Sequence, residues 1–157
     1  MRIMKSKKAT LQILNQLIQM HHDRIAGYKL AATVLKDNDT ELLQHFNDCC
    51  EESKYYIAQC ADEVWQNKGK AKIRSSTLGK IFRVIMKGRC SLSSQNKSSV
   101  IALCMWGEYA MQKAYETAQY QSNEITDTAV RLINTQHSAL RRNYLHQKEH
   151  YHSPILA

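Results

Sequence analysis

Apolar residues recur along most of the chain at alternating steps of three and four, the spacing typical of helices that bury one face in a bundle. In the first such stretch, His21 and Tyr28 stand among aliphatic seam positions, and in the second Ser53 does. The pattern predicts four long helices with polar breaks between them. Their expected ranges are about 8–37, 40–67, 95–120 and 125–151.

The second and third predicted helices are separated by a long crossover, residues 69–94. Links between antiparallel neighbours are usually much shorter, so this crossover can run back along the bundle and leave the two helices parallel. Its middle, residues 78–87, has apolar residues at helical spacing and predicts a short helix. One long crossover is the arrangement of ferritin-like bundles, which the spacing allows without requiring.

Composition supports a helical domain that spans residues 1–157. Apolar residues make up 43% of the chain, and the single proline and five glycines are fewer than a strand-rich fold needs. The N-terminal segment is basic but too often interrupted by polar residues to be a signal peptide or membrane span. We therefore expect a cytoplasmic protein with no transmembrane segment. Five cysteines without a CxxC pair are expected to be reduced and mostly buried. The two tryptophans are expected to pack in the interior.

Positive charge is concentrated in the crossover. The net charge is +8, and no Asp or Glu occurs from Val64 to Gly107. Such a segment can attract an anion: a nucleic acid, a phospholipid surface or an acidic protein. The simpler interpretation is a solvated connector whose apolar face packs on the bundle. The candidate anion-binding residues are Lys70, Lys72, Arg74, Lys80, Arg83, Lys87 and Arg89.

Several short motifs also match a known family in order and spacing. They are Leu14-Asn15-Gln16-Leu17-Ile18, Asp23-Arg24-Ile25-Ala26-Gly27-Tyr28, Gly79-Lys80-Ile81-Phe82-Arg83-Val84, Cys104 with Gly107-Glu108, Ala114-Tyr115-Glu116, and Gln136 with Ala139-Leu140. On these residues the sequence resembles a bacterial family of four-helix-bundle proteins of unknown function in the ferritin-like superfamily. The resemblance implies the fold and a suspected role in stress. Here Met105 and Tyr109 replace two acids of the family pattern, and Tyr144 stands where a histidine is usual.

The ligand set of a ferritin-like di-iron centre is absent from the expected core. Such a centre takes a carboxylate from each of two helices and a Glu-x-x-His step from each of the other two. That step occurs only at Glu149–His152, beside Pro154. His146 and His150 are spaced to share a helix face, but we interpret them as solvated surface histidines. No phosphate loop, dinucleotide fingerprint or GxSxG motif indicates another enzyme class.

Polar residues are nevertheless expected in the middle of the bundle. Counting from the turns brings His21, Glu52, Glu108 and His137 to similar levels. One hypothesis is a degenerate or mononuclear metal site. The favoured one is a polar layer in which the acids pair with histidine, Tyr144 or Arg24, because a buried charge needs a partner. Gly107 would let a neighbouring helix approach closely enough to supply that partner.

The sequence thus predicts an all-α, ferritin-like four-helix bundle with a long crossover that contains a short helix. We expect no enzymatic activity and no cofactor, and instead a structural, stress-related or interaction role as a homo-oligomer, for example a dimer. A metal-binding bundle with a degenerate site and an anion-surface binder are the two alternatives.

Overall fold

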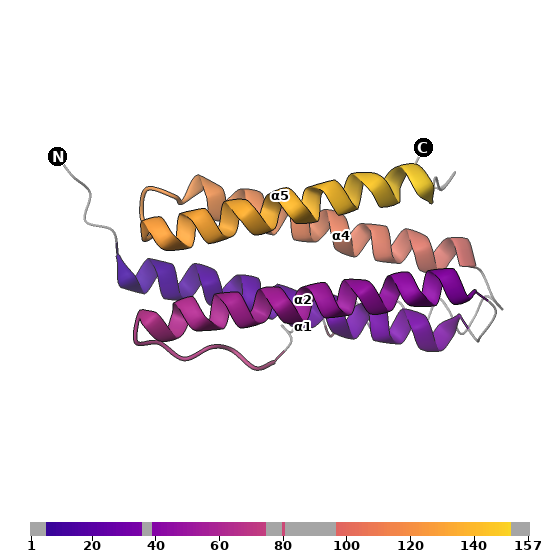
Figure 1. The fold of residues 1–157 in the computed structure, drawn as a ribbon, viewed down its shortest axis with the longest axis horizontal. Coiled ribbons are helices and arrows are strands. Elements are labelled where there is room, and N and C mark those ends of the chain that lie inside the picture. Colours follow the sequence, from indigo (N-terminus) through magenta and orange to yellow (C-terminus); the bar gives the residue numbers. More distant parts are fainter. Residues whose placement is uncertain (1–5, 36–38, 75–79, 81–96, 152–157) are drawn as a thin grey trace.

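The computed structural model describes residues 6–35, 39–74, 80 and 97–151 and forms an elongated bundle of four helices (Figure 1). In chain order these are α1 (Lys7–Val34), α2 (Thr40–Gln66), α4 (Lys97–Tyr120) and α5 (Asp127–His150). No strand occurs among these residues. The predicted all-α four-helix bundle is therefore confirmed. Apart from Lys80, the predicted short helix over 78–87 lies outside the described residues.

Side-chain caps explain where three of the helices begin. Ser6 accepts a hydrogen bond from the backbone N–H of Ala9, and Asp39 accepts one from that of Leu42 at 3.0 Å. Thr126 caps α5 in the same way. These bonds satisfy N–H groups that the first turn of a helix leaves without an intrahelical acceptor.

At the end of α2 the left-handed residue is a lysine, although a glycine, Gly69, stands next to it. Lys68 takes the left-handed conformation, with φ of 61°. The N–H of Lys68 bonds the carbonyl of Trp65, and that of Gly69 bonds the carbonyl of Val64, which is a Schellman motif. Gly69 instead allows a close approach, because a Cβ there would lie 2.3 Å from Leu11 Cδ2.

The helices α2 and α4 run parallel. Lys97, the first residue of α4, is ion-paired with Asp39, the cap of α2, so both helices begin at the same end of the bundle (Figure 1). The helices α1 and α5 run in the opposite direction. After α2 the chain turns back and follows the bundle as an extended segment, which is the start of the crossover.

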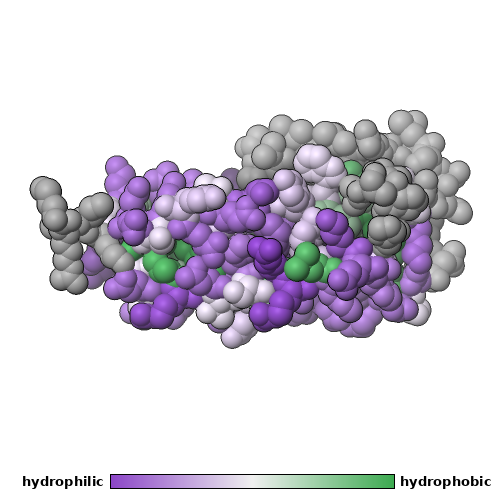
Figure 2. Space-filling view, turned by 90° about the horizontal axis from the view of Figure 1, so that it is seen from above, coloured by the Kyte–Doolittle hydropathy of each residue, from purple (hydrophilic) through white to green (hydrophobic). Residues whose placement is uncertain are grey.

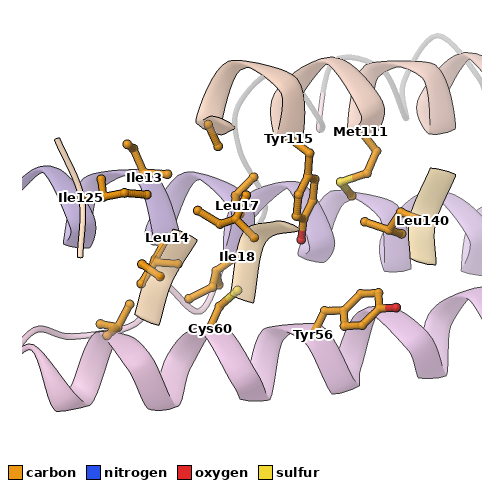
Figure 3. Packing of buried hydrophobic residues seen from close by; sticks show 14 residues of the cluster. Ile13, Leu14, Leu17, Ile18, Tyr56, Cys60, Met111, Tyr115, Ile125 and Leu140 are labelled. Carbon is orange, nitrogen blue, oxygen red and sulfur yellow. The ribbon is translucent and has the colours of Figure 1, made fainter. Parts of the chain in front are cut away.

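The core consists of two apolar clusters. The larger one draws on all four helices, and Figure 3 shows Tyr115 of α4 pointing into it. The smaller one lies toward the start of α2 and includes Tyr28, Phe46 and Val100. Between them along the helices stand buried polar residues, among them His21, Arg24, Ser53 and Glu108. The interior is therefore divided by a polar layer.

The outside of the bundle is mostly hydrophilic on the face viewed in Figure 2, from the side of α5. Within the described part of the chain, no helix is both long enough and apolar enough to cross a lipid bilayer. Both tryptophans depart from the prediction that they are buried. As whole residues, Trp65 and Trp106 are 71% and 60% exposed.

Candidate functional site

The polar layer is centred on an ion pair between α1 and α4. Glu108 is 1% exposed, and its Oε1 accepts hydrogen bonds from Arg24 Nε at 2.7 Å and from the Tyr28 hydroxyl at 2.5 Å. A charge-assisted pair of this kind offsets much of the cost of taking a carboxylate out of water. Glu108 is thus buried beside a cationic partner supplied by another helix.

Arg24 also connects the layer to α2. Its Nη1 lies 3.1 Å from the carbonyl oxygen of Cys49, 2.9 Å from Ser53 Oγ and 2.9 Å from Glu52 Oε1. Burial acts to lower the pKa of Arg24, but Glu108 and then Tyr28 raise it, and the net pKa lies well above the ordinary value. The guanidinium is therefore charged and holds three helices together.

Glu52 lies at the edge of this layer. Its side chain is 20% exposed, and besides the contact with Arg24 it accepts a hydrogen bond from Asn143 of α5. The two acids, one on α2 and one on α4, therefore approach the same guanidinium from different sides.

His21 continues the layer toward the larger apolar cluster. Its Nδ1 is 3.0 Å from Ser53 Oγ, and its Nε2 is 2.7 Å from the Tyr115 hydroxyl. Burial, followed by the charge of Arg24, sets the pKa of His21 well below its ordinary value. His21 is consequently neutral near pH 7, with both ring nitrogens engaged.

The hydrogen bonds that link Arg24, Ser53, His21, Tyr115 and Gln136 form a chain in which every donor points the same way. The amide nitrogen of Gln136 donates to the backbone carbonyl of Tyr56, because a carbonyl can only accept. The side-chain oxygen of Gln136 therefore accepts the hydrogen bond from the Tyr115 hydroxyl, with 2.7 Å between the two oxygens. Tyr115 then accepts from His21 Nε2–H, and Nδ1 accepts from Ser53. Because arginine can only donate, Ser53 accepts from it. The chain runs from Arg24 through Ser53, His21 and Tyr115 to Gln136.

The structure brings together only part of the set that the sequence suggested for a metal. His137 lies beside Tyr115, with ring centroids 5.9 Å apart and nearly parallel planes. It is therefore about two helical turns from the level of Glu108. Tyr144 is half-buried, and Glu108 makes its described hydrogen bonds to Arg24 and Tyr28 instead. Among the residues with described positions, no three His, Cys, Asp or Glu side chains are grouped to hold a metal ion.

The sequence analysis did not predict that Ser53, Tyr115 and Gln136 belong to this hydrogen-bonded chain. It also did not predict Tyr28 as a partner of Glu108. The signal was present in part. Tyr28 and Ser53 are polar or amphipathic residues at positions of an apolar seam, where a hydroxyl must find a partner. Which partner it finds depends on the relative levels of the helices.

Gly107 does not have the role that the sequence suggested. A Cβ built at this position meets no described atom within 4 Å, so neither α1, α2 nor α5 approaches closely there. Glu108 reaches its partners because the arginine and tyrosine side chains are long. The close approach of two backbones is not needed.

The cysteines with described positions give no sign of an activated nucleophile. Burial raises the pKa of Cys49 and of Cys60 to about 12, where the reactive thiolate is scarce near neutral pH. Cys104 is half-buried. The His146 and His150 rings stack with centroids 6.2 Å apart on the exposed face of α5, and His152 lies outside the described residues.

The basic crossover is described in part. Lys70, Lys72, Arg74 and Lys80 are exposed, whereas Arg83, Lys87 and Arg89 lie outside the described residues. The described portion is held against α1. The amide of Asn15 donates to the carbonyl of Lys70 at 3.1 Å and accepts from the N–H of Lys72 at 2.8 Å.

Comparison with known proteins shows one family match. Residues 9–121, which include most of α1 and all of α2 and α4, and hence Arg24, Ser53 and Glu108, match the domain of unknown function DUF2383. No significant match was found among curated proteins, nor among solved structures. Because the matched range covers most of the chain, this protein belongs to the DUF2383 family.

Proposed function

We propose that this protein is a non-enzymatic, ferritin-like bundle that acts by associating with a second copy of itself through the outer face of α4. The parallel α2 and α4, joined by a long crossover, support the ferritin-like relationship. The polar layer supports a structural assignment, because its hydrogen bonds are made largely among its own members. The observation that carries the proposal is a row of exposed aromatic residues on α4.

This row follows the helical repeat on the side of α4 opposite to Glu108 and Tyr115. Trp106, Tyr109 and Tyr120 are 60%, 46% and 88% exposed. Trp106 and Tyr109 contact each other edge to face, with centroids 6.4 Å apart. Tryptophan and tyrosine are enriched at protein interfaces because they bury large areas with little loss of side-chain entropy.

The charges within the row suit a second copy of the chain. Lys113 Nζ lies 5.4 Å from the centre of the Tyr109 ring and 2.9 Å from Glu116, so the row as a whole is neutral. The rest of the protein, with a net charge of +8, repels other copies. When two α4 helices pair antiparallel about a twofold axis between Lys113 and Glu116, each lysine faces the other copy's glutamate.

Sedimentation velocity over a range of protein concentrations tests the proposal. We expect the unmodified chain to dimerise and the double variant Trp106→Ser/Tyr109→Ser to remain monomeric. The matched control, Tyr55→Ser/Trp65→Ser, removes a tyrosine and a tryptophan from the exposed surface of α2 and should still dimerise. A monomeric parent chain, or equal loss of the dimer in both variants, would refute the assignment to α4.

Charge exchange provides a second, independent test of the pairing. Lys113→Glu and Glu116→Lys should each weaken the dimer, because like charges then face each other across the axis. The exchanged double variant Lys113→Glu/Glu116→Lys should recover it. If the double variant is as weak as the singles, the antiparallel arrangement is wrong.

A further inference from the structure

The segment that follows α2 and leads into the crossover, residues 67–74, is a surface feature here called the strap. It leaves α2 at the Schellman motif and runs extended along the bundle (Figure 1). Gly69 lets it lie directly on Leu11. The side-chain amide of Asn15 donates a hydrogen bond to the carbonyl of Lys70 and accepts one from the N–H of Lys72. His22 Nε2 donates to the carbonyl of Lys72 over 3.3 Å. Four contacts from α1 thus fix the course of the strap.

This anchoring leaves a row of cations facing outward. Ala71 packs on the larger apolar cluster, while Lys68, Lys70, Lys72 and Arg74 are exposed. The strap itself contains no acidic residue. Four positive charges within eight residues, on a backbone held by hydrogen bonds, form a dense electropositive surface. Little entropy remains to be lost in ordering that backbone on a partner.

An exposed aliphatic residue stands between two of these cations in the sequence. Ile73 is 81% exposed between Lys72 and Arg74, and Trp65, just before the strap, is 71% exposed. An exposed isoleucine can form neither a hydrogen bond nor an ion pair with the sugar and phosphate groups of a nucleic acid. At a bilayer surface, aliphatic side chains enter the boundary between headgroups and acyl chains, and indole rings settle at headgroup level.

We propose that the strap is a docking site for the surface of an anionic lipid bilayer. The cations of the strap attract acidic headgroups, and Ile73 enters the interface between them. Binding is peripheral and reversible, because one aliphatic side chain and four charges are a weak anchor. This inference is independent of association through α4, since the strap and α4 share no residue.

Vesicle sedimentation of the full chain tests the proposal. We expect binding to vesicles of phosphatidylcholine mixed with phosphatidylserine, a weakening of that binding with added salt, and none to phosphatidylcholine alone. Each cation near the surface contributes about five-fold in partitioning, so Lys70→Ser/Lys72→Ser/Arg74→Ser should lose roughly a hundred-fold. Absence of binding to the mixed vesicles at low salt, or equal binding to both kinds of vesicle, overturns the proposal.

A matched control separates a built site from general charge attraction. The triple variant Arg131→Ser/Arg142→Ser/Lys148→Ser removes the same charge from exposed positions of α5, across the bundle from the strap in Figure 1. It should retain most of the binding. Equal losses in the two triple variants would mean that only net charge matters, which overturns the strap as a site.

Ile73→Ser distinguishes lipid from nucleic acid. We expect it to weaken vesicle binding roughly ten-fold, because the aliphatic side chain no longer enters the interface. If Ile73→Ser leaves vesicle binding unchanged while a single-stranded oligonucleotide displaces the parent chain from vesicles, the partner is a nucleic acid. Asn15→Leu, which keeps every charge but releases the strap from α1, should also weaken vesicle binding. Undiminished binding would show that the anchored course is irrelevant and would remove the structural basis of the proposal.

Discussion

Arg24 on α1 and Glu108 on α4 form an ion pair of 2.7 Å whose side chains are only 4% and 1% exposed. Both charges are almost fully shielded from bulk water, so each depends on partners inside the protein. Tyr28 donates a second hydrogen bond to the same carboxylate oxygen, and Ser53 accepts one from the guanidinium. The predictions that follow start from this arrangement.

Removing one member of the pair should cost far more than removing both. Glu108→Leu leaves Arg24 with the partly exposed Glu52 as its remaining acidic partner, and we expect a loss toward the lower end of the about 3–5 kcal/mol in the free energy of unfolding that breaking a buried pair costs. Arg24→Met/Glu108→Leu, which fills the space with apolar groups, should recover most of that loss. Urea denaturation of the two variants measures the difference. Equal destabilisation would mean that cavity formation dominates over charge.

Acid should destabilise the fold through His21. The pKa of His21 is lower in the folded protein than in the unfolded chain, so the unfolded chain binds the proton more readily. The contribution of neutral His21 to the free energy of unfolding is therefore complete only above the unfolded pKa of about 6.5. As pH falls below that value, the free energy of unfolding should decrease by up to about 1.4 kcal/mol per pH unit for this group. His45 and His137, whose pKa values burial also lowers, act in the same direction.

Denaturation curves between pH 7.5 and pH 5, as an approximate working range around the histidine pKa, measure this slope. His21→Gln removes the titrating group that faces Arg24, so its slope should be shallower than that of the parent chain. A slope identical in both proteins would assign the acid sensitivity to the other histidines.

The glycines give a matched pair of opposite sign. Gly107→Ala meets no described atom within 4 Å inside α4, so it should stabilise the protein by about 0.8–1 kcal/mol through helix propensity. Gly69→Ala places a methyl group 2.3 Å from Leu11 Cδ2 and should destabilise, because Leu11 or the strap must move. Thermal unfolding of both variants is the test, and stabilisation by Gly69→Ala would contradict the close contact.

Thiol labelling should separate the buried cysteines from those of the unfolded chain. Near neutral pH, Cys49 and Cys60 should react with iodoacetamide far more slowly in the native protein than in urea, since burial raises their pKa to about 12 and blocks access. Mass spectrometry of labelled peptides gives the rate at each site. Fast native labelling of Cys60 would indicate that the larger apolar cluster opens readily.

The helices and their approximate ends followed from the sequence because apolar periodicity and capping residues are local signals. The hydrogen-bonded series of side chains in the polar layer could not be predicted from the sequence, because it depends on how far each helix is shifted along its neighbours. Counting from the turns placed His21 and Glu108 in the interior but also suggested that His137 would approach the acid. In the structure, His137 packs on Tyr115 instead.

Surface features were the least predictable. A tryptophan in an apolar run is usually buried, yet Trp106 lies on the outer face of α4. Successive residues of a helix are about 100° apart around its axis, so Trp106 lies roughly opposite the buried Glu108. The anchoring of the strap by Asn15 was equally hidden. It joins residues 55 positions apart, and one asparagine gives no sequence signal of such a pairing.

The one-way order of donors and acceptors from Arg24 to Gln136 limits how the four rods can assemble. A purely aliphatic seam tolerates a shift of one rod by a turn, since one leucine replaces another at little cost. Here the same shift would leave an arginine, a histidine and a glutamate without their hydrogen-bond partners in an interior that excludes water. The chain should therefore discriminate sharply against misaligned assemblies, and variants that replace the layer by aliphatic residues should gain alternative packings even where they gain stability.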